Sequence, residues 1–255
     1  MISIIITHHK TPELLHVCVE SIKKTFKDCE IIICDSEADK KIDIKDVQVL
    51  SFKKNTGYAF LVNQGIKKSK GEYVLILNAD IVVLEDSIQK MLNYMEKYEK
   101  IGILGPQLID FTGNIQISCF AYPTISSIVA RRTPFKKLKR GKNILNKFTI
   151  KEWDRTTTRE VDWIQGSAIM VRKKAIDKIG LMDERFFMYF EDVDWCRRFW
   201  QKGYKVVYYS KARMAHYYHR ASKKFGAILD VVLNKQSRIH IYSALKYFKK
   251  WKYVK

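Results

Sequence analysis

The sequence predicts an α/β fold with a doubly wound, mostly parallel sheet flanked by helices, and three observations support this prediction. Short apolar runs without polar alternation, such as Tyr73 to Leu77, are typical of strands buried on both faces of a parallel sheet. Segments with helical spacing of apolar residues separate these runs, in the order β-α-β-β-α-β up to Asn78. Several runs also end on polar side chains, and in such sheets the ligand binds outside the carboxyl ends of the strands.

Each element is predicted from its own pattern. Helices are expected to begin at Pro12, where proline suits the first turn, and near Tyr58 and Asp86. Pro106 is expected to stop its strand. His8 and His9 are assigned to the loop after the first strand, near the base pocket, and are poorer candidates than His216 for binding a metal. Apolar runs predict strands at 2–6, 30–34, 47–52, 73–78, 101–106, 115–120 and 205–209, with a turn that leads into a further strand over 161–171.

Length and composition indicate one large globular domain with a sizeable core. The chain has 255 residues, of which 47% are apolar. Its five cysteines show no CxxC or CxxH spacing, which argues against a disulfide framework or a structural zinc site and fits a reducing compartment. The apolar start is far too short for a signal peptide, and no stretch approaches a membrane-spanning helix.

The charge of the chain predicts an anionic partner. The formal net charge is +20, and the excess is concentrated in two blocks, 131–147 and 220–255. Nucleic acid, anionic lipid and a phosphorylated substrate are all partners that such charge attracts. Block 131–147 contains Pro134 and Gly141 as helix breakers, so we expect a solvated mobile loop, a basic flap over an anionic donor or lipid phosphate, or both.

Polar residues follow three of the predicted strands. Thr7 follows the first strand, Asp35 the second, and Asn78 and Asp80 the strand that begins at Tyr73. The topology would collect these side chains in one crevice, where oxygen donors suit Mg²⁺ or Mn²⁺ bridging to a phosphate. An Asx-type turn is the alternative for Asn78-Ala79-Asp80 alone. No Gly-rich dinucleotide fingerprint or Walker-type loop follows the first strand, which disfavours a dinucleotide cofactor or an ATP-driven motor.

The second half of the chain carries a candidate general base. Glu191 and Asp192 follow five large apolar residues, and a carboxylate beside an apolar wall at a helix start can serve as a base. Enrichment of acids at a helix N-terminus is the alternative, and it explains Asp194. Trp163 is either a core aromatic or a platform for a sugar ring, and Gly166 would let a ligand approach the backbone.

Together these residues resemble an inverting family-2 glycosyltransferase with a GT-A fold. The resemblance is greatest to the rhamnosyltransferase-like branch of bacterial polysaccharide synthesis, and it covers about residues 1–225. Each motif is short, and their occurrence in the family's order and spacing carries the resemblance. The motifs are an opening Ile-Ile-Thr, Asn55-Thr56-Gly57-Tyr58-Ala59 with Asn63-Gln64-Gly65, Leu77-Asn78-Ala79-Asp80, Trp163-Ile164-Gln165-Gly166 and Phe190-Glu191-Asp192-Val193-Asp194.

The resemblance implies a reaction and a role for each residue. A sugar would move, with inversion, from dTDP-rhamnose or a UDP-sugar to a hydroxyl of a glycan or lipid-linked glycan. The first 110 residues would bind the nucleotide, and 111–225 would bind the acceptor and hold the base. Nucleotide-sugar binding would fall to Thr7, Asp35, Asn55, Gly57, Asn63, Asn78 and Asp80. Asp192 would be the base, Glu191 would orient the acceptor or support the base, and Trp163 and Gly166 would contact the acceptor.

The resemblance also implies a divalent metal, Mg²⁺ or Mn²⁺. Asp80 and His216 would bind this ion, which would offset charge on the departing diphosphate. Asn78 stands where the family has the first acid of its metal signature, so the site has one carboxylate fewer than usual. The segment after Asp35 follows the family pattern only loosely, so the sequence leaves uridine and thymidine open as the base.

The tail 226–255 is predicted to be a basic amphipathic helix. Ile241, Tyr242, Leu245, Phe248 and Trp251 lie near one helical face, and lysines flank that face. The pattern favours an interfacial helix on anionic lipid, and a terminal helix that packs on the domain is the alternative. With a lipid-linked acceptor, the expected location is cytoplasmic and peripheral on the inner face of the cell membrane.

Three other functions are compatible with parts of the sequence. A nucleic-acid-binding protein would explain the charge, but zinc-ligand spacing and recognised nucleic-acid motifs are missing, so we expect no nucleic-acid partner. A nucleotidyltransferase would share the strand-end acids, but the basic Gly-rich loop that holds a triphosphate is missing. A catalytically inactive family member that only binds glycan is the third alternative.

Overall fold

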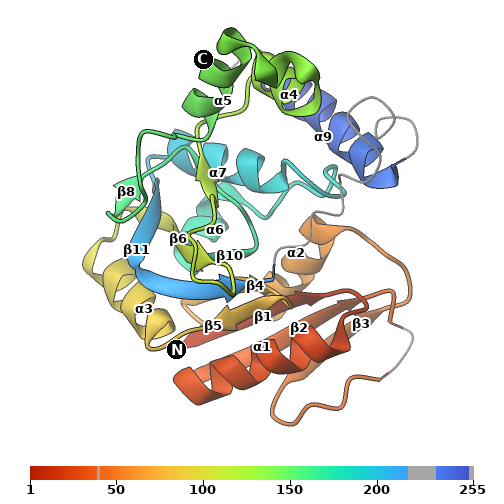
Figure 1. Ribbon diagram of the computed structural model, residues 1–255. Coiled ribbons are helices and arrows are strands. Elements are labelled where there is room, and N and C mark those ends of the chain that lie inside the picture. Colours follow the sequence, from red (N-terminus) through yellow and green to blue (C-terminus); the bar gives the residue numbers. More distant parts are fainter. Residues whose placement is uncertain (39–40, 218–233, 253–255) are drawn as a thin grey trace.

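The fold is built around one large mixed sheet. The computed structural model describes residues 1–38, 41–217 and 234–252 (Figure 1). Its strands are β1 (Ile2–His8), β2 (Cys29–Ser36), β3 (Gln48–Phe52), β4 (Tyr73–Asn78), β5 (Ile81–Val83), β6 (Ile101–Ile109), β8 (Arg159–Glu160), β10 (Ala168–Arg172) and β11 (Lys205–His216). The strand order is β3-β2-β1-β4-β10-β6-β11-β5, with β8 paired to β11. A second, two-stranded sheet joins β7 (Cys119–Phe120) to β9 (Trp163–Ile164).

Helices cover both faces of the large sheet, as a doubly wound fold requires. The described helices are α1 (Pro12–Thr25), α2 (Tyr58–Lys68), α3 (Ser87–Lys97), α4 (Ile125–Arg132), α5 (Lys139–Phe148), α6 (Lys173–Ile179), α7 (Glu191–Gln201) and α9 (Lys235–Trp251), with a 3₁₀ turn η1 (Pro134–Lys137). Along β1, Ile4 packs with α1 and α3 while its neighbour Ile5 packs with α2 and α7. The alternation of side chains along a strand therefore supplies both cores from one apolar run.

The direction of the strands changes near the middle of the sheet. β1 to β4 are parallel, but β10 runs antiparallel to both of its neighbours, β4 and β6. β11 then pairs in parallel with β6 and antiparallel with β5. The sheet is therefore mostly parallel, as predicted, but strands from the second half of the chain lie between strands of the first half.

Three local predictions are corrected by the structure. Pro106 does not stop its strand. Strand β10 pairs with β6 only as far as Leu104, so at Pro106 the strand β6 has β11 as its one neighbour among the described strands. A proline without an N–H is tolerated at such a place in a sheet. The expected strand 115–120 is reduced to a single bridge at Ile115 and the short β7. The last strand extends beyond the expected residue 209 to His216.

The basic block 131–147 is helical rather than a mobile loop. Thr124 caps α4 by accepting from the backbone N–H of Ser127, and the chain continues through η1 into α5. Gly141 lies inside α5, where a Cβ atom would come within 2.0 Å of the Phe135 carbonyl oxygen. Gly141 therefore allows α5 to pack closely on η1 and does not break the helix.

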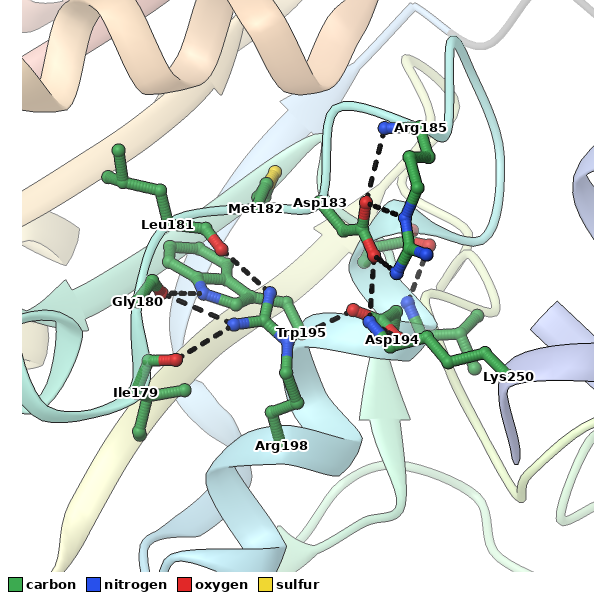
Figure 2. A network of polar contacts seen from close by, with 12 residues as sticks. Ile179, Gly180, Leu181, Met182, Asp183, Arg185, Asp194, Trp195, Arg198 and Lys250 are labelled. Atoms are coloured by element: carbon green, nitrogen blue, oxygen red, sulfur yellow. Dashed lines mark hydrogen bonds and ion pairs between the residues drawn. The ribbon is translucent and has the colours of Figure 1, made fainter. Parts of the chain in front are cut away.

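The C-terminal helix α9 packs on the domain through one face. Asp194 is fully buried and accepts from the indole N–H of Trp251 at 2.9 Å and from Lys250 Nζ at 2.7 Å, while Arg198 Nε donates to its other oxygen at 3.0 Å. Lys250 also reaches Asp183 at 2.8 Å (Figure 2). This network fixes the end of α9 to the start of α7.

For the tail, the sequence left open a terminal helix that packs on the domain, and one face of α9 packs in this way. Tyr247 and Trp251 point inward and are buried, whereas Tyr242 and Leu245 point outward and are exposed. The apolar stripe is thus divided between two faces. The remaining tail residues, 226–233 and 253–255, lie outside the described residues. Among the described helices, none combines the length and the hydropathy needed to cross a bilayer.

Candidate active site

The ends of three neighbouring strands bring predicted donor-binding residues together. β1 lies between β2 and β4, and the parallel register sets Thr7 opposite Asn78 and His8 opposite Asp35. The Thr7 hydroxyl donates to Asn78 Oδ1 at 3.1 Å. Asp80 follows two residues after the end of β4. Thr7, Asp35, Asn78 and Asp80 therefore gather at one edge of the sheet, as the topology predicts.

Asp35 is held by His8, for which the sequence predicted a place near the base pocket but no contact with Asp35. His8 is the last residue of β1 and is buried, so its assignment to a loop is wrong. Its Nδ1 lies 2.8 Å from Asp35 Oδ1, and its Nε2 accepts from the backbone N–H of Thr11 at 3.0 Å. Because Nε2 accepts, Nδ1 carries the proton and donates to the carboxylate. His8 therefore fixes the orientation of Asp35.

Asn78 offers a ligand a hydrogen-bond donor rather than an oxygen. Its Oδ1 already accepts from Thr7, and its backbone N–H donates to the Ser167 carbonyl at 2.9 Å. Its Nδ2 has no hydrogen-bond partner among the described residues. An amide N–H suits a phosphate or sugar oxygen, so Asn78 fits donor binding and does not fit metal coordination.

Asp80 and His216 face one another at the proposed metal corner. His216 Nε2 lies 3.6 Å from Asp80 Oδ2, and His216 Nδ1 lies 2.9 Å from Gln116 Oε1. The Gln116 amide also donates through Nε2 to the His216 carbonyl at 2.9 Å. An amide oxygen only accepts, so Nδ1 carries the proton and Nε2 is the acceptor nitrogen on the side of Asp80.

These residues fit a divalent ion that is completed by a substrate. Asp80 Oδ1 is buried and has no hydrogen-bond partner among the described residues, an arrangement that a cation would relieve. No group of three or more His, Cys, Asp or Glu side chains suited to a metal occurs in the described part of the chain. Mg²⁺ is typically bound by one or two carboxylates together with phosphates and water, so a small protein ligand set suits it.

One turn connects the metal corner with the candidate base. The backbone N–H of Gly166 donates to Asp192 Oδ2 at 3.1 Å, and the next residue, Ser167, accepts from the backbone of Asn78. The Tyr58 hydroxyl donates to the Gly166 carbonyl. Burial and the carboxylates of Glu191, Asp192 and Asp80, in that order, raise the pKa of Tyr58 well above its usual value. The phenol of Tyr58 therefore stays a hydrogen-bond donor. It lies within electrostatic range of Asp80 and of the pair Glu191 and Asp192.

The two neighbouring acids have different surroundings. Asp192 accepts from the backbone N–H groups of Gly166 and Val193, the latter at 2.8 Å, and burial raises its pKa to about 6. Glu191 is buried, and its Oε2 has no hydrogen-bond partner among the described residues. Burial and the charge of Asp192 raise the pKa of Glu191 well above its usual value. Asp192 is therefore the carboxylate, and Glu191 holds the proton.

A strained turn precedes these acids. Tyr189 and Phe190 both have a φ of 70°, in the left-handed region that bulky residues avoid. The Phe190 ring lies 5.3 Å from the ring of Tyr247 on α9, and Ser243 on α9 donates to the Met188 carbonyl at 2.9 Å. The contacts with α9 therefore hold the turn that sets the position of Glu191 and Asp192.

Asn63 does not reach the candidate site. It is buried on α2, where its Nδ2 donates to the Met182 carbonyl at 2.9 Å and to Glu184 at 2.8 Å, while its Oδ1 accepts from Met182 N–H at 3.0 Å. These bonds use its donor and acceptor groups within the protein. The prediction that Asn63 binds the donor is therefore corrected to a role in fixing the 182–184 segment.

The Asn55-Gly57 turn also has an internal explanation. Asn55 is exposed and accepts from the backbone N–H of Gly57 at 3.2 Å. Gly57 has a φ of +88°, and a Cβ there would come within 2.3 Å of the Phe187 carbonyl oxygen. The glycine lets the start of α2 dock against the 186–190 segment, and its predicted donor contact stays a prediction.

Trp163 is a core aromatic. Its ring centroid lies 4.7 Å from that of Phe120 in a stacked arrangement, and its Nε1 donates to the Ala121 carbonyl at 3.0 Å. Only 8% of the residue is exposed, which leaves little ring surface for a sugar. The packing corrects the acceptor-stacking prediction, while Gly166 remains at the site through its bond to Asp192.

The structure adds contacts that the sequence analysis did not predict for His8, Tyr58 and Gln116. Tyr58 belongs to a motif that the resemblance includes, and His8 lies next to Thr7, so proximity in sequence could have identified both. Gln116 lies far in sequence from His216, and no pattern in the chain links them. Two open surface hollows, of about 400 Å³ along α5 and about 670 Å³ beside α1, contain no predicted site residue, so the strand ends remain the candidate site.

Comparison with known proteins finds glycosyltransferases among the relatives of this chain. The chain is 29% identical over 185 residues to the N-acetylglucosaminyl-diphospho-decaprenol L-rhamnosyltransferase of Mycobacterium tuberculosis, a match that covers 68% of this chain and 59% of that protein. It is 25% identical over 260 residues to the rhamnosyltransferase WbbL of Escherichia coli, covering 97% of this chain and 92% of that one. The match thus spans well under two thirds of the mycobacterial relative's length.

The solved structures show the fold. The crystal structure of GalNAc-T7 with UDP, GalNAc and Mn²⁺ aligns with a TM-score of 0.67 at 17% identity, over 86% of this chain and 43% of that chain. This likeness confirms the GT-A fold predicted from the sequence. The profile described as "Glycosyl transferase family 2" matches residues 3–180. A match over most of the chain, on a sheet whose strand ends carry the motif residues, establishes that the chain belongs to glycosyl transferase family 2.

Proposed function

We propose that this protein transfers a sugar from a nucleotide-diphosphate donor to a hydroxyl of a glycan or lipid-linked glycan, with inversion, in cell-surface polysaccharide synthesis. One observation carries the proposal. The turn Gly166-Ser167 binds the carboxylate of Asp192 on one side and the backbone of Asn78 on the other. A candidate base and a candidate diphosphate corner are thereby held in one rigid unit, which direct transfer between two substrates requires.

The strand ends would bind the donor. Asp35, oriented by His8, offers a carboxylate to the N–H groups of a pyrimidine base, and Thr7 positions the Asn78 amide for a phosphate or sugar oxygen. Asp80 and His216 would hold Mg²⁺ or Mn²⁺, which when bound offsets the negative charge of the diphosphate. Gln116 would keep His216 in the tautomer that a metal needs.

Asp192 would remove the proton from the acceptor hydroxyl as that oxygen attacks the anomeric carbon from the face opposite the leaving diphosphate. Attack from that face inverts the configuration. The raised pKa of Asp192 suits this role, because a base works best when its pKa lies near the operating pH. Protonated Glu191 would orient the acceptor as a hydrogen-bond donor without adding a second negative charge.

The names of the relatives support the finer assignment. Both compared relatives are named rhamnosyltransferases, which favours dTDP-rhamnose over a UDP-sugar as the donor. The mycobacterial name specifies a lipid-linked diphosphate acceptor, and an acceptor of that class would place this protein at the inner face of the cell membrane, in the cytoplasm. The metal, the donor and this location are all parts of the proposal.

The first test measures binding and transfer in one variant. Asp192→Asn should reduce transfer by about a hundredfold to ten-thousandfold, because general-base catalysis contributes about 10²–10⁴ and the amide cannot accept the proton. The variant should keep the thermal stabilisation that nucleotide sugars and Mn²⁺ give, since donor contacts lie elsewhere. The exposed Asp177→Asn is the matched control. Transfer at the wild-type rate by Asp192→Asn refutes the assignment of the base.

The second test addresses the metal. A chelator should remove transfer activity, and Mn²⁺ or Mg²⁺ should restore it. Asp80→Asn should weaken Mn²⁺ binding in the presence of a nucleoside diphosphate, as measured by the loss of the free-ion electron paramagnetic resonance signal on titration. Full activity in the chelated protein would exclude the metal from the proposal, and unchanged Mn²⁺ affinity in Asp80→Asn would move the site elsewhere.

A further inference from the structure

The helices at one end of the molecule form a surface that the proposed reaction does not use. α4, η1, α5 and α9 lie together at the top of Figure 1, away from the strands β1 to β3. Figure 1 draws α4 beside α9, and the charges of Arg132 and Arg131 at the end of α4 act on His240 of α9. The segments 125–148 and 235–251 are here called the basic platform.

Large apolar side chains stand exposed on the basic platform. Each is between 46% and 66% exposed, although α4 and α9 have buried faces of their own. A protein surface rarely gathers several such side chains without a partner. They are Ile125, Val129, Leu138, Tyr242 and Leu245.

The charge of the basic platform has one sign. No acidic residue occurs between Asp110 and Glu152, and none occurs in α9. The outward row of α9 places Lys235 and Arg238 on one side of Tyr242 and Leu245, and Lys249 on the other. The open hollow along α5 is similarly lined by cations around an apolar centre, with Lys139, Arg140, Asn143, Ile144 and Lys147 as its lining.

We infer that the basic platform docks on the surface of a bilayer rich in anionic phospholipid. Aliphatic and aromatic side chains between cations are the composition of an interfacial helix, in which the apolar groups enter the headgroup boundary and the cations meet lipid phosphates. A nucleic acid would favour aromatic stacking platforms among the cations, and Ile125, Val129, Leu138 and Leu245 are aliphatic. Four of the five exposed apolar side chains are aliphatic, and this composition favours a lipid surface over a nucleic acid.

Docking through this face would orient the candidate site. The inner face of α9 holds the turn before Glu191, so the acceptor-binding half lies on the side of the molecule that carries the basic platform. The inference rests on the proposed function in one respect: a lipid-linked acceptor gives the protein a reason to dock on a membrane. The surface itself is defined by residues that take no part in donor binding or catalysis.

The test uses the full chain and vesicles of two compositions, phosphatidylcholine alone and phosphatidylcholine with phosphatidylglycerol. Sedimentation should show binding at least tenfold tighter to the anionic vesicles, and Tyr242→Ser with Leu245→Ser should weaken that binding about tenfold. Lys137→Gln with Lys139→Gln should do the same at low salt. The matched controls are Val17→Ser with Tyr98→Ser, and Lys174→Gln with Lys178→Gln, which alter exposed residues elsewhere and should change binding less than twofold.

Three results overturn the inference: equal binding to both vesicle types, platform variants that bind like the controls, or duplex DNA that displaces the protein from anionic vesicles at equal phosphate concentration. Each variant is checked for folding by circular dichroism and by the midpoint of its thermal unfolding. Transfer to a water-soluble acceptor separates the two proposals. Its absence in the wild type would refute the proposed function and leave the vesicle result standing, while platform variants should retain it.

Discussion

At the scale of single residues, the candidate site depends on two adjacent acids that differ in hydrogen bonding. Asp192 receives two backbone N–H groups, whereas Glu191 Oε2 receives none among the described residues. Backbone donors stabilise a carboxylate, and burial without donors favours the neutral acid. The difference supports the proposal that Asp192 is the base and that neutral Glu191 has a supporting role.

The pKa of Asp192 predicts an acid limb in the pH profile. Burial raises this pKa to about 6 from the usual 3.8. Because the base must be ionised, kcat/KM should rise tenfold per pH unit below about pH 6 and level off above it. Stability changes with pH in the opposite direction to activity. Because the carboxyl pKa is raised in the folded protein, Asp192 contributes stability that is fully present below about pH 4 and is lost as the pH rises through about 6. A steady-state profile with a soluble acceptor measures the limb, and a limb near pH 4 contradicts the assignment.

The protonation of Glu191 makes a second prediction. A glutamine has the shape and the donor capacity of a protonated glutamate, so Glu191→Gln should keep transfer within about tenfold of the wild type and leave the acid limb in place. Glu191→Ala, which removes the donor, serves as the comparison and should lose more. If Glu191→Gln loses activity as completely as Asp192→Asn, then Glu191 acts as a charged group.

Residue positions were predictable where a side chain stands at the end of a strand. Thr7, Asp35, Asn78 and Asp80 meet because the strands that precede them are in register, and apolar runs reveal those strands. Buried polar residues were not predictable in the same way. Asn63 lies in a family-like motif, but its partners come from residues 182–184, and a sequence does not show which distant carbonyl a buried amide will meet.

At the scale of elements, α9 has two faces with separate tasks. Its inner face fixes the turn at Tyr189 and Phe190, whose left-handed backbone costs about 1–3 kcal/mol per residue unless the surroundings hold it. Helical periodicity predicted this helix and its apolar residues, but it could not divide them between the domain and solvent. That division depends on Asp194 and Asp183, which bind Lys250 from other elements.

The network around Asp194 predicts a large loss of stability on truncation. Asp194→Ala should lower the free energy of unfolding by about 3–5 kcal/mol, because Lys250 and Arg198 would lose a buried carboxylate that both contact. Urea unfolding followed by circular dichroism measures the change. Asp177→Ala, at an exposed site on α6, should change stability by less than about 0.5 kcal/mol. Equal effects of the two substitutions would show that the network contributes little.

The basic block shows why element type is harder to predict than element position. Pro134 and Gly141 indicated a break in regular structure, and Pro134 does begin a separate 3₁₀ turn. Gly141 instead lies within a helix, because the helix needs space against the Phe135 backbone. Glycine thus marks either flexibility or close packing, and only the tertiary structure distinguishes them.

At the scale of the whole molecule, the two predicted functional halves share one sheet. β10 and β11 come from the second half, and each pairs with strands of the first half on both sides. The division of the chain at residue 110 therefore remains a prediction about function and has no counterpart in the order of the strands. Alternating β and α patterns predicted the fold class, but an antiparallel strand inserted between β4 and β6 leaves no signal in those patterns.

Shared pairing predicts that neither half folds alone. Fragments 1–110 and 111–255 should each lack cooperative thermal unfolding, because β4 and β6 lose the strand between them and β10 loses both partners. Circular dichroism of the separate and mixed fragments measures this. Two fragments that unfold cooperatively when separate would contradict the shared sheet.

The position of β10 also affects the protein during its synthesis. When β6 has left the ribosome, the edges of β4 and β6 that will face β10 have no partner, and both strands are rich in buried aliphatic residues. Translation at about 5–20 residues per second leaves these edges unpaired for several seconds until Ala168–Arg172 emerges. The nascent chain is then exposed to pairing with other chains, so chaperone supply and translation speed should determine how much active protein a cell obtains.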